Sequence, residues 1–100
     1  MALVYLTKEV TSSNTLTEVG TVSADSKCNI YILNKDSSNG TFRLAISAAS
    51  PTNKDYIFYD FPIKQNGTFV VTDVFITATH KVWIYSPANF VVRVDGTGTV

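Results

Sequence analysis

Residues 66–95 read NGTFVVTDVFITATHKVWIYSPANFVVRVD, and this stretch decides the fold. It contains three segments rich in β-branched and aromatic residues, separated by a break near His80 and by a turn at 86–89. In the last segment, every second residue from Phe90 to Val94 is apolar, which is the period of a half-buried strand. Because connections this short reverse the chain, the stretch predicts an antiparallel meander of three strands.

Five further segments have strand character, at 3–6, 16–22, 28–33, 41–47 and 56–59. A polar turn ending in Gly40 separates two of them and predicts a hairpin of 28–33 with 41–47. Asn66-Gly67 is a second hairpin signal. No segment has an apolar period of 3.6 residues, so no helix longer than a turn is expected. About eight short strands predict an all-β fold, an Ig-like or jelly-roll-type antiparallel β-sandwich.

The chain has 100 residues, which predicts a single domain over 1–100, with residues 1–8 as a docking strand or arm. Charged residues make up only 16%, against about 25% in a typical domain. We therefore expect part of the surface to be covered in an assembly. The net charge is zero and the Lys and Arg residues are scattered, which argues against a nucleic-acid partner. The N-terminus has no basic region and no segment reaches the ~20 apolar residues of a membrane span, so we expect no signal peptide and no membrane partner.

Residues that could carry catalysis are few. His80, the only histidine, lies at an expected turn with no nucleophile to activate. Cys28 lies in a strand pattern and is interpreted as a small buried hydrophobe. A general acid–base pair stays open only if the fold brings Asp60 and Asp73 together. The run Asp36–Gly40 lacks the second acidic ligand of a calcium loop. The sequence thus predicts no enzyme, no catalytic residues, no cofactor and no metal site.

Aromatic and aliphatic residues alternate in three strands, and the sequence leaves open which set faces outward. In one strand, either Trp83 and Tyr85 or the residues Val82 and Ile84 are exposed. One alternative is a two-layer sandwich in which a central strand packs on one layer and loops cover its other face. The other alternative is an interface, since exposed Trp and Tyr are enriched as anchors there. The residues that we predict for a partner interface are Leu3, Tyr5, Tyr31, Tyr59, Trp83 and Tyr85.

Several motifs follow one another in a defined order: a strand ending at Asn34, TFRLAI at 41–46, YIFYD at 56–60, Asn-Gly-Thr at 66–68, HKVWIYS at 80–86, and a last strand that closes at Gly96. This order resembles a group of small virion proteins of tailed phages. The resemblance covers about Leu16 to Gly96 and consists of strand and turn patterns. It implies an Ig-like β-sandwich that serves as a capsid decoration (cement) protein or as a tail component, and it supplies no catalytic residues.

We therefore expect a non-enzymatic phage virion structural protein that binds and stabilises the capsid surface as a homo-oligomer. Its partners would be the major capsid protein or other virion subunits, and its location the virion, after synthesis in the host cytoplasm. Edge strands and the N-terminal segment could add strands to a partner's sheet. The alternative is a tail or baseplate component, or a module that binds a host glycan or receptor by stacking Trp83 and Tyr85 on sugars.

Overall fold

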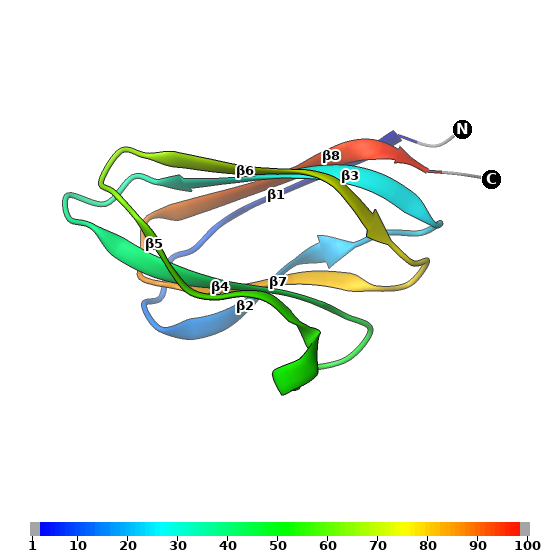
Figure 1. Ribbon diagram of the computed structural model, residues 1–100, viewed down its shortest axis with the longest axis horizontal. Helices are drawn as coiled ribbons and strands as arrows, with labels where there is room; N and C mark the ends of the chain where they lie inside the picture. Colours follow the sequence, from blue (N-terminus) through cyan, green and yellow to red (C-terminus); the bar gives the residue numbers. More distant parts are fainter. Residues whose placement is uncertain (1–2, 99–100) are drawn as a thin grey trace.

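The computed structural model describes residues 3–98, which form eight β-strands and one short 3-10 helix, η1. The elements are β1 (Leu3–Glu9), β2 (Thr15–Thr21), β3 (Ser26–Asn34), β4 (Gly40–Ser47), η1 (Asn53–Asp55), β5 (Tyr56–Ile63), β6 (Thr68–Ile76), β7 (Lys81–Ser86) and β8 (Phe90–Gly98). They build two four-stranded sheets that face one another (Figure 1). Sheet A has the order β1-β8-β3-β6 and sheet B the order β2-β7-β4-β5. The predicted all-β sandwich is confirmed.

The strand pairing is that of a long hairpin rolled up on itself. β1 pairs with β8, β2 with β7, β3 with β6 and β4 with β5, and each pair is antiparallel. Rolling adds the pairs β3–β8 and β4–β7, which complete the two sheets. An Ig-like sandwich instead pairs several consecutive strands within one sheet. Of the two predicted sandwich types, the topology is therefore the jelly roll.

The predicted meander and both predicted hairpins are wrong, because the chain crosses between the sheets at these turns. β6, β7 and β8 lie in sheets A, B and A, so the stretch 66–95 does not form a meander. The turn ending at Gly40 leads from sheet A to sheet B, and the Asn66-Gly67 turn leads back. A short turn fixes only the reversal of direction. Crossing the sandwich buries the apolar faces of successive strands against each other, and this outcome follows from tertiary packing.

The core lies between the sheets and follows the alternation of the central strands. Burial alternates at every residue along β3 and β7. Val82 and Ile84 are therefore inside and fully buried, whereas Trp83 and Tyr85 are partly exposed on the outer face. The same alternation places the aromatic Tyr31 outside. The fully buried aliphatic side chains of the two central strands of sheet A are Ile30, Ile32, Val92 and Val94.

Four phenylalanines close the sandwich between the edge strands β5 and β6. Phe42, Phe58, Phe61 and Phe69 have ring centroids between 4.6 and 6.1 Å apart. Because Phe58 packs against this core, its neighbours in β5 are exposed, Ile57 by 45% and Tyr59 by 58%. The 56–59 strand is one of the three strands whose outward set the sequence left undecided, and the structure packs Phe58 against the core and exposes Ile57 and Tyr59.

The buried side chain of Asn34 holds the loops at one end of the sandwich. Its Nδ2 donates to the carbonyl oxygens of Ser38 at 3.0 Å and Ile63 at 3.3 Å, and its Oδ1 accepts from the backbone N–H of Asp36 at 2.9 Å. Its backbone also bonds to the 66–67 turn. One residue at the end of sheet A thus fixes the two turns that cross to and from sheet B.

Candidate interaction surfaces

The six predicted interface residues lie on two opposite faces of the sandwich. Leu3, Tyr5 and Tyr31 are on the outer face of sheet A, with β8 between them in the register. The other three, on β5 and β7, are on the outer face of sheet B: Tyr59, Trp83 and Tyr85. The fold therefore does not bring the six together in one surface.

The outer face of sheet A carries most of the exposed apolar side chains among the described residues. Of the six large hydrophobics that are exposed, four are on this face: Leu3, Tyr5, Val70 and Phe75. Leu3 is 84% exposed and Phe75 is 75% exposed. Val70 lies opposite Tyr31 in the register, which places it on the same face. Leu3 and Tyr5 lie on the edge strand β1 and Val70 and Phe75 on the opposite edge strand β6, with β8 and β3 between them. Exposed apolar groups on one face are a feature of interaction sites on soluble domains.

Arg93 lies at the centre of the outer face of sheet A. Its guanidinium carbon is 5.1 Å from the ring centroid of Tyr5 and 5.8 Å from that of Tyr31. Its Nε is 3.3 Å from a carboxylate oxygen of Asp95. Beside it lies an open hollow lined by Tyr31, Leu33, Thr68, Val91 and Arg93. The face thus combines apolar and aromatic side chains with the ion pairs Arg93–Asp95 and Lys27–Asp73.

Another arginine, Arg43, is enclosed by its neighbours on the outer face of sheet B. Its guanidinium carbon lies 4.0 Å from the ring centroid of Tyr59 and 4.7 Å from that of Tyr85. Its Nε donates to a carboxylate oxygen of Asp60 at 2.7 Å. This hydrogen bond is the main cause that raises the pKa of Arg43 above its usual value. The cation is therefore fixed between two rings and a carboxylate of the chain itself.

The remaining aromatic rings of sheet B also contact the chain. Trp83 Nε1 donates to the carbonyl oxygen of Ser47 at 3.3 Å, and Ala45, its register partner in β4, is fully buried. The rings of Tyr56 and Tyr59 meet edge to face at a centroid distance of 5.4 Å. The polar groups described here have hydrogen-bond partners within the chain, and the aromatic rings contact other side chains of the chain.

The residues considered for catalysis take part in contacts that stabilise the fold. Asp60 pairs with Arg43 in sheet B, whereas Asp73 lies 3.5 Å from the Nζ of Lys27 in sheet A, so the fold does not make an acid–base pair of them. His80 lies at the turn before β7, with Nδ1 3.3 Å from the carbonyl oxygen of Ala78. Within residues 3–98, no group of three or more His, Cys, Asp or Glu could hold a metal ion.

Cys28 is buried in the core, as predicted. Burial raises the pKa of its thiol, and the nearby charge of Asp95 adds to this effect. A thiol with a raised pKa has little thiolate at neutral pH, and thiolate is the reactive form. Cys28 therefore acts as a core residue.

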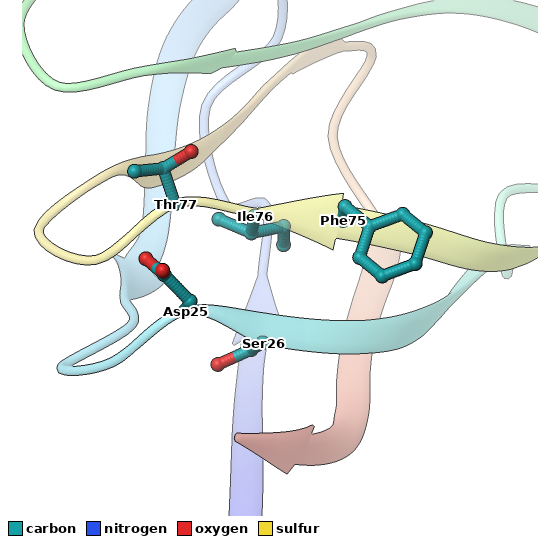
Figure 2. Close-up of a pocket in the computed structure, with 5 residues that line it drawn as sticks. All are labelled: Asp25, Ser26, Phe75, Ile76 and Thr77. Carbon is teal, nitrogen blue, oxygen red and sulfur yellow. The ribbon is translucent and has the colours of Figure 1, made fainter. Parts of the chain in front are cut away.

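Figure 2 shows a hollow at the end of the sandwich that is lined by Asp25, Ser26, Phe75, Ile76 and Thr77. The carboxylate of Asp25 points toward the segment of Thr77, whereas the ring of Phe75 lies on the other side of the hollow (Figure 2). Asp25 Oδ1 accepts from the backbone N–H of Ala78 at 2.8 Å. The hollow measures about 240 Å³, less than the roughly 300 to 1,000 Å³ of ligand pockets. The carboxylate of Asp25 connects two loops, so its role is structural.

Sequence reasoning missed Val70 and Phe75 on the outer face of sheet A, and it missed Arg93 at the centre. A signal for the first two was present. Residues 69–71 and 74–76 are apolar at consecutive positions, so β6 is apolar on both faces, as the strands at 3–6 and 28–33 are. A strand of this kind is covered on both sides or presents one side to a partner.

No family model matches the chain, and no match was found among the curated proteins or among the solved structures. The resemblance to small virion proteins of tailed phages therefore stays a prediction, and the Ig-like topology that it implied is not the one observed. Within residues 3–98, no helix has the length and apolar character needed to cross a membrane.

Proposed function

We propose that the protein is a non-enzymatic structural protein of a phage virion, of the capsid decoration type, that docks on neighbouring virion subunits through the outer face of sheet A. One observation carries the docking surface: four of the six exposed large hydrophobics lie on this face, Leu3 and Tyr5 along one edge strand and Val70 and Phe75 along the other. The assignment to a virion rests on the motif order described above. The partners would be the major capsid protein or other virion subunits.

The size of the apolar face favours docking at many sites over one tight contact. Fully burying one large apolar side chain contributes about 1.5–3 kcal/mol, so four contribute at most about 6–12 kcal/mol. Association costs an estimated 4–15 kcal/mol or more in lost freedom. A single copy would therefore bind weakly, and linked copies on a lattice would bind well through avidity. Such a protein stabilises the assembled shell by mass action, because it binds the lattice better than free subunits.

The first experiment is the copy number in purified particles, measured by quantitative mass spectrometry against the major capsid protein. Hundreds of copies in a simple ratio to the capsid protein are expected for a decoration protein. A few to a few tens of copies would move the protein to the tail or baseplate. Absence from the particle would overturn the virion assignment.

A pair of matched variants tests the docking face. Tyr5→Ser with Phe75→Ser removes two exposed apolar side chains from sheet A, and Tyr59→Ser with Ile57→Ser removes two from sheet B. In a co-sedimentation assay with undecorated particles, the first variant is expected to lose binding and the second to keep it. The reverse result would place the docking surface on sheet B.

A second candidate function, binding of a host glycan or receptor, is favoured by the outer face of sheet B. Four aromatic rings gather there beside Arg43: Tyr56, Tyr59, Trp83 and Tyr85. Aromatic faces bind apolar faces of ligands and offer polar tips at the edge. A glycan array with the purified protein and with Trp83→Ala tests this candidate. A signal that disappears in the variant supports it, and no signal with either protein counts against it.

A further inference from the structure

Four edge strands bound the two sheets, and three of them are interrupted. β2 shifts its register between Glu18 and Gly20. β5 contains Pro62 and has Asp60 in the left-handed region, with φ 51°. β6 shifts its register against β3 and has Asp73 at φ 59°. Bulges and prolines of this kind protect an edge from pairing with another strand.

The fourth edge strand, β1, has none of these interruptions. All seven residues of Leu3–Glu9 pair one to one with residues 97 to 91 of β8, without a register shift. The strand contains no proline and no residue with positive φ. Its only charged residues are Lys8 and Glu9 at the end. β1 is therefore the one edge on which a further strand can be added over its whole length.

Along β1, the backbone N–H and C=O groups of successive residues point alternately to β8 and to the free edge of the sheet. Val10, just after the strand, donates its N–H to the carbonyl oxygen of Phe90 at 2.7 Å and accepts from the N–H of Asn89 at 2.8 Å. Residues two apart in a strand point their N–H and C=O groups the same way. The N–H and C=O groups directed at the free edge thus belong to Leu3, Tyr5, Thr7 and Glu9.

We propose that two copies of this chain pair along β1, antiparallel about a two-fold axis, and join their A sheets into one. The full-length register places Leu6 opposite its mate, Tyr5 opposite Thr7 and Leu3 opposite Glu9. About eight backbone hydrogen bonds result, since each of four edge residues on both strands offers one donor and one acceptor. A strand is the occupant that satisfies such a row of groups.

A second copy of this chain fits the edge for two reasons. The chain has a net charge of zero, so two copies do not repel each other. Leu3 and Tyr5, which are among its most exposed apolar side chains, lie at the edge itself and become covered from the side by the mate's Glu9 and Thr7. An isologous contact of this kind also closes with two copies and leaves no further β1 edge free.

This inference rests on the proposed function, because the dimer would matter for docking on a virion lattice. Joined A sheets present two docking faces side by side on one surface. Two linked faces bind a lattice with a higher effective affinity than one. The outer face of sheet A stays accessible from the front, because β1 pairs through its edge and the mate covers Leu3 and Tyr5 only from the side.

The test is the oligomeric state of the isolated full-length protein, measured by analytical ultracentrifugation over a concentration series. Thr7→Pro removes an N–H directed at the free edge and leaves the β1–β8 hydrogen bonds in place, which an edge strand tolerates. The matched control, Thr7→Val, keeps the N–H. Dimers are expected for the wild type and for Thr7→Val, and monomers for Thr7→Pro.

A second variant serves if Thr7→Pro does not fold, as judged by circular dichroism. Tyr5→Lys with Thr7→Lys places four added charges around the two-fold axis and is expected to give a folded monomer. A wild type that stays monomeric at its highest soluble concentration overturns the proposal. A dimer that persists in both variants also overturns it, because the contact then lies elsewhere.

Particle binding separates this inference from the proposed function. A wild-type monomer that still co-sediments with particles would overturn the dimer and leave the docking role intact. A β1 dimer that does not bind particles would support the dimer and count against the virion assignment.

Discussion

The outer faces of the two sheets each place one arginine among tyrosines, yet the two arginines have different surroundings. The Arg43 side chain in sheet B is 27% exposed and bonds to Asp60 at 2.7 Å. The Arg93 side chain in sheet A is 53% exposed and lies 3.3 Å from Asp95. The rings over Arg43 are 4.0 and 4.7 Å away, and those over Arg93 are 5.1 and 5.8 Å away. The same residue types thus form a closed cluster on one face and an open one on the other.

This difference teaches that aromatic content alone does not identify a docking face. Trp83 and Tyr85 are the most prominent aromatic pair in the sequence, but they pack against β4. Tyr5 and Phe75 lie on strands at the edges of sheet A and are 63% and 75% exposed. Whether a ring is available to a partner depends on how much of it the chain itself covers.

The largest effect is expected at Gly96, because both faces depend on one sandwich. Gly96 lies in β8 between Val4 of β1 and Cys28 of β3. A Cβ at this position would overlap the carbonyl oxygen of Lys27 and lie 2.7 Å from the Cα of Cys28, so the backbone of β3 would have to move. We expect Gly96→Ala to lower the free energy of unfolding by about 4 kcal/mol or more, measured by urea denaturation.

Gly20→Ala is the matched control for this prediction. A Cβ there would lie 2.9 Å from a methyl carbon of Leu6, which can rotate away. A smaller loss of stability is expected. Equal losses at the two glycines would contradict the close contact between β8 and β3.

The next largest effect is expected at Asn34, which connects the end of sheet A with the loops that cross to sheet B. Asn34→Ala removes three hydrogen bonds and leaves buried backbone groups without partners. The expected loss is about 2–3 kcal/mol. The control, Asn39→Ala, removes one exposed bond to the N–H of Gln65 and should cost much less. A similar cost for both would mean that Asn34 does not couple the sheets.

The sequence predicted the inward residues of the core well, because their period of two depends only on strand geometry. Phe90, Val92 and Val94 share the buried face as expected. It did not predict which sheet each strand joins. The turns at Gly40 and Asn66-Gly67 specify a reversal, and only the packing of whole faces decides that the reversal crosses the sandwich.

The outer faces were predicted only in part, since coverage depends on neighbours distant in sequence. Tyr5 and Tyr31 were expected at an interface and are on the open face of sheet A. The enclosure of Arg43 depends on Asp60, which lies in the register shift between Phe58 and Phe61 and has a positive φ of 51°. No local sequence pattern predicts this bulge. The sequence therefore identifies candidate aromatic residues, and the fold determines which of them are covered and which are exposed.

A direct test of the comparison is to remove each arginine in turn. Arg43→Ala breaks two ring contacts and the hydrogen bond to Asp60, whereas Arg93→Ala breaks longer and more exposed contacts. We expect a clearly larger fall in Tm for Arg43→Ala, measured by calorimetry. The fall should depend on salt only weakly, because the stacking of the rings is lost as well. Equal falls would remove the distinction between a closed and an open face.

A smaller effect on stability is expected for the exposed side chains of sheet A. Tyr5→Ser and Phe75→Ser remove rings that are 63% and 75% exposed and whose contacts with Arg93 and Lys27 are long, at 5.1 and 5.9 Å. Each should therefore change the free energy of unfolding by about 0.5 kcal/mol or less. Their effect should appear in association, as described above. Trp83→Ser, on the closed face, should instead lower stability. A large loss of stability for Phe75→Ser would show that its ring packs against the chain.

The smallest effect is expected at Asp55, in the loop before β5 and away from both faces. Its carboxylate accepts from the backbone N–H of Thr52 at 2.8 Å and from its hydroxyl at 3.0 Å. The backbone bond is the main cause that lowers the pKa of Asp55 below its usual 3.8. A lowered pKa means that the stabilisation is complete above the unfolded value of 3.8 and is lost as pH falls through the folded value. Asp55→Asn should therefore melt slightly below the wild type at neutral pH, and the two Tm values should converge in acid. A gap that persists in acid would assign the effect to packing. A gap as large as that of Arg43→Ala would show that the loop stabilises the sandwich as much as the enclosed arginine does.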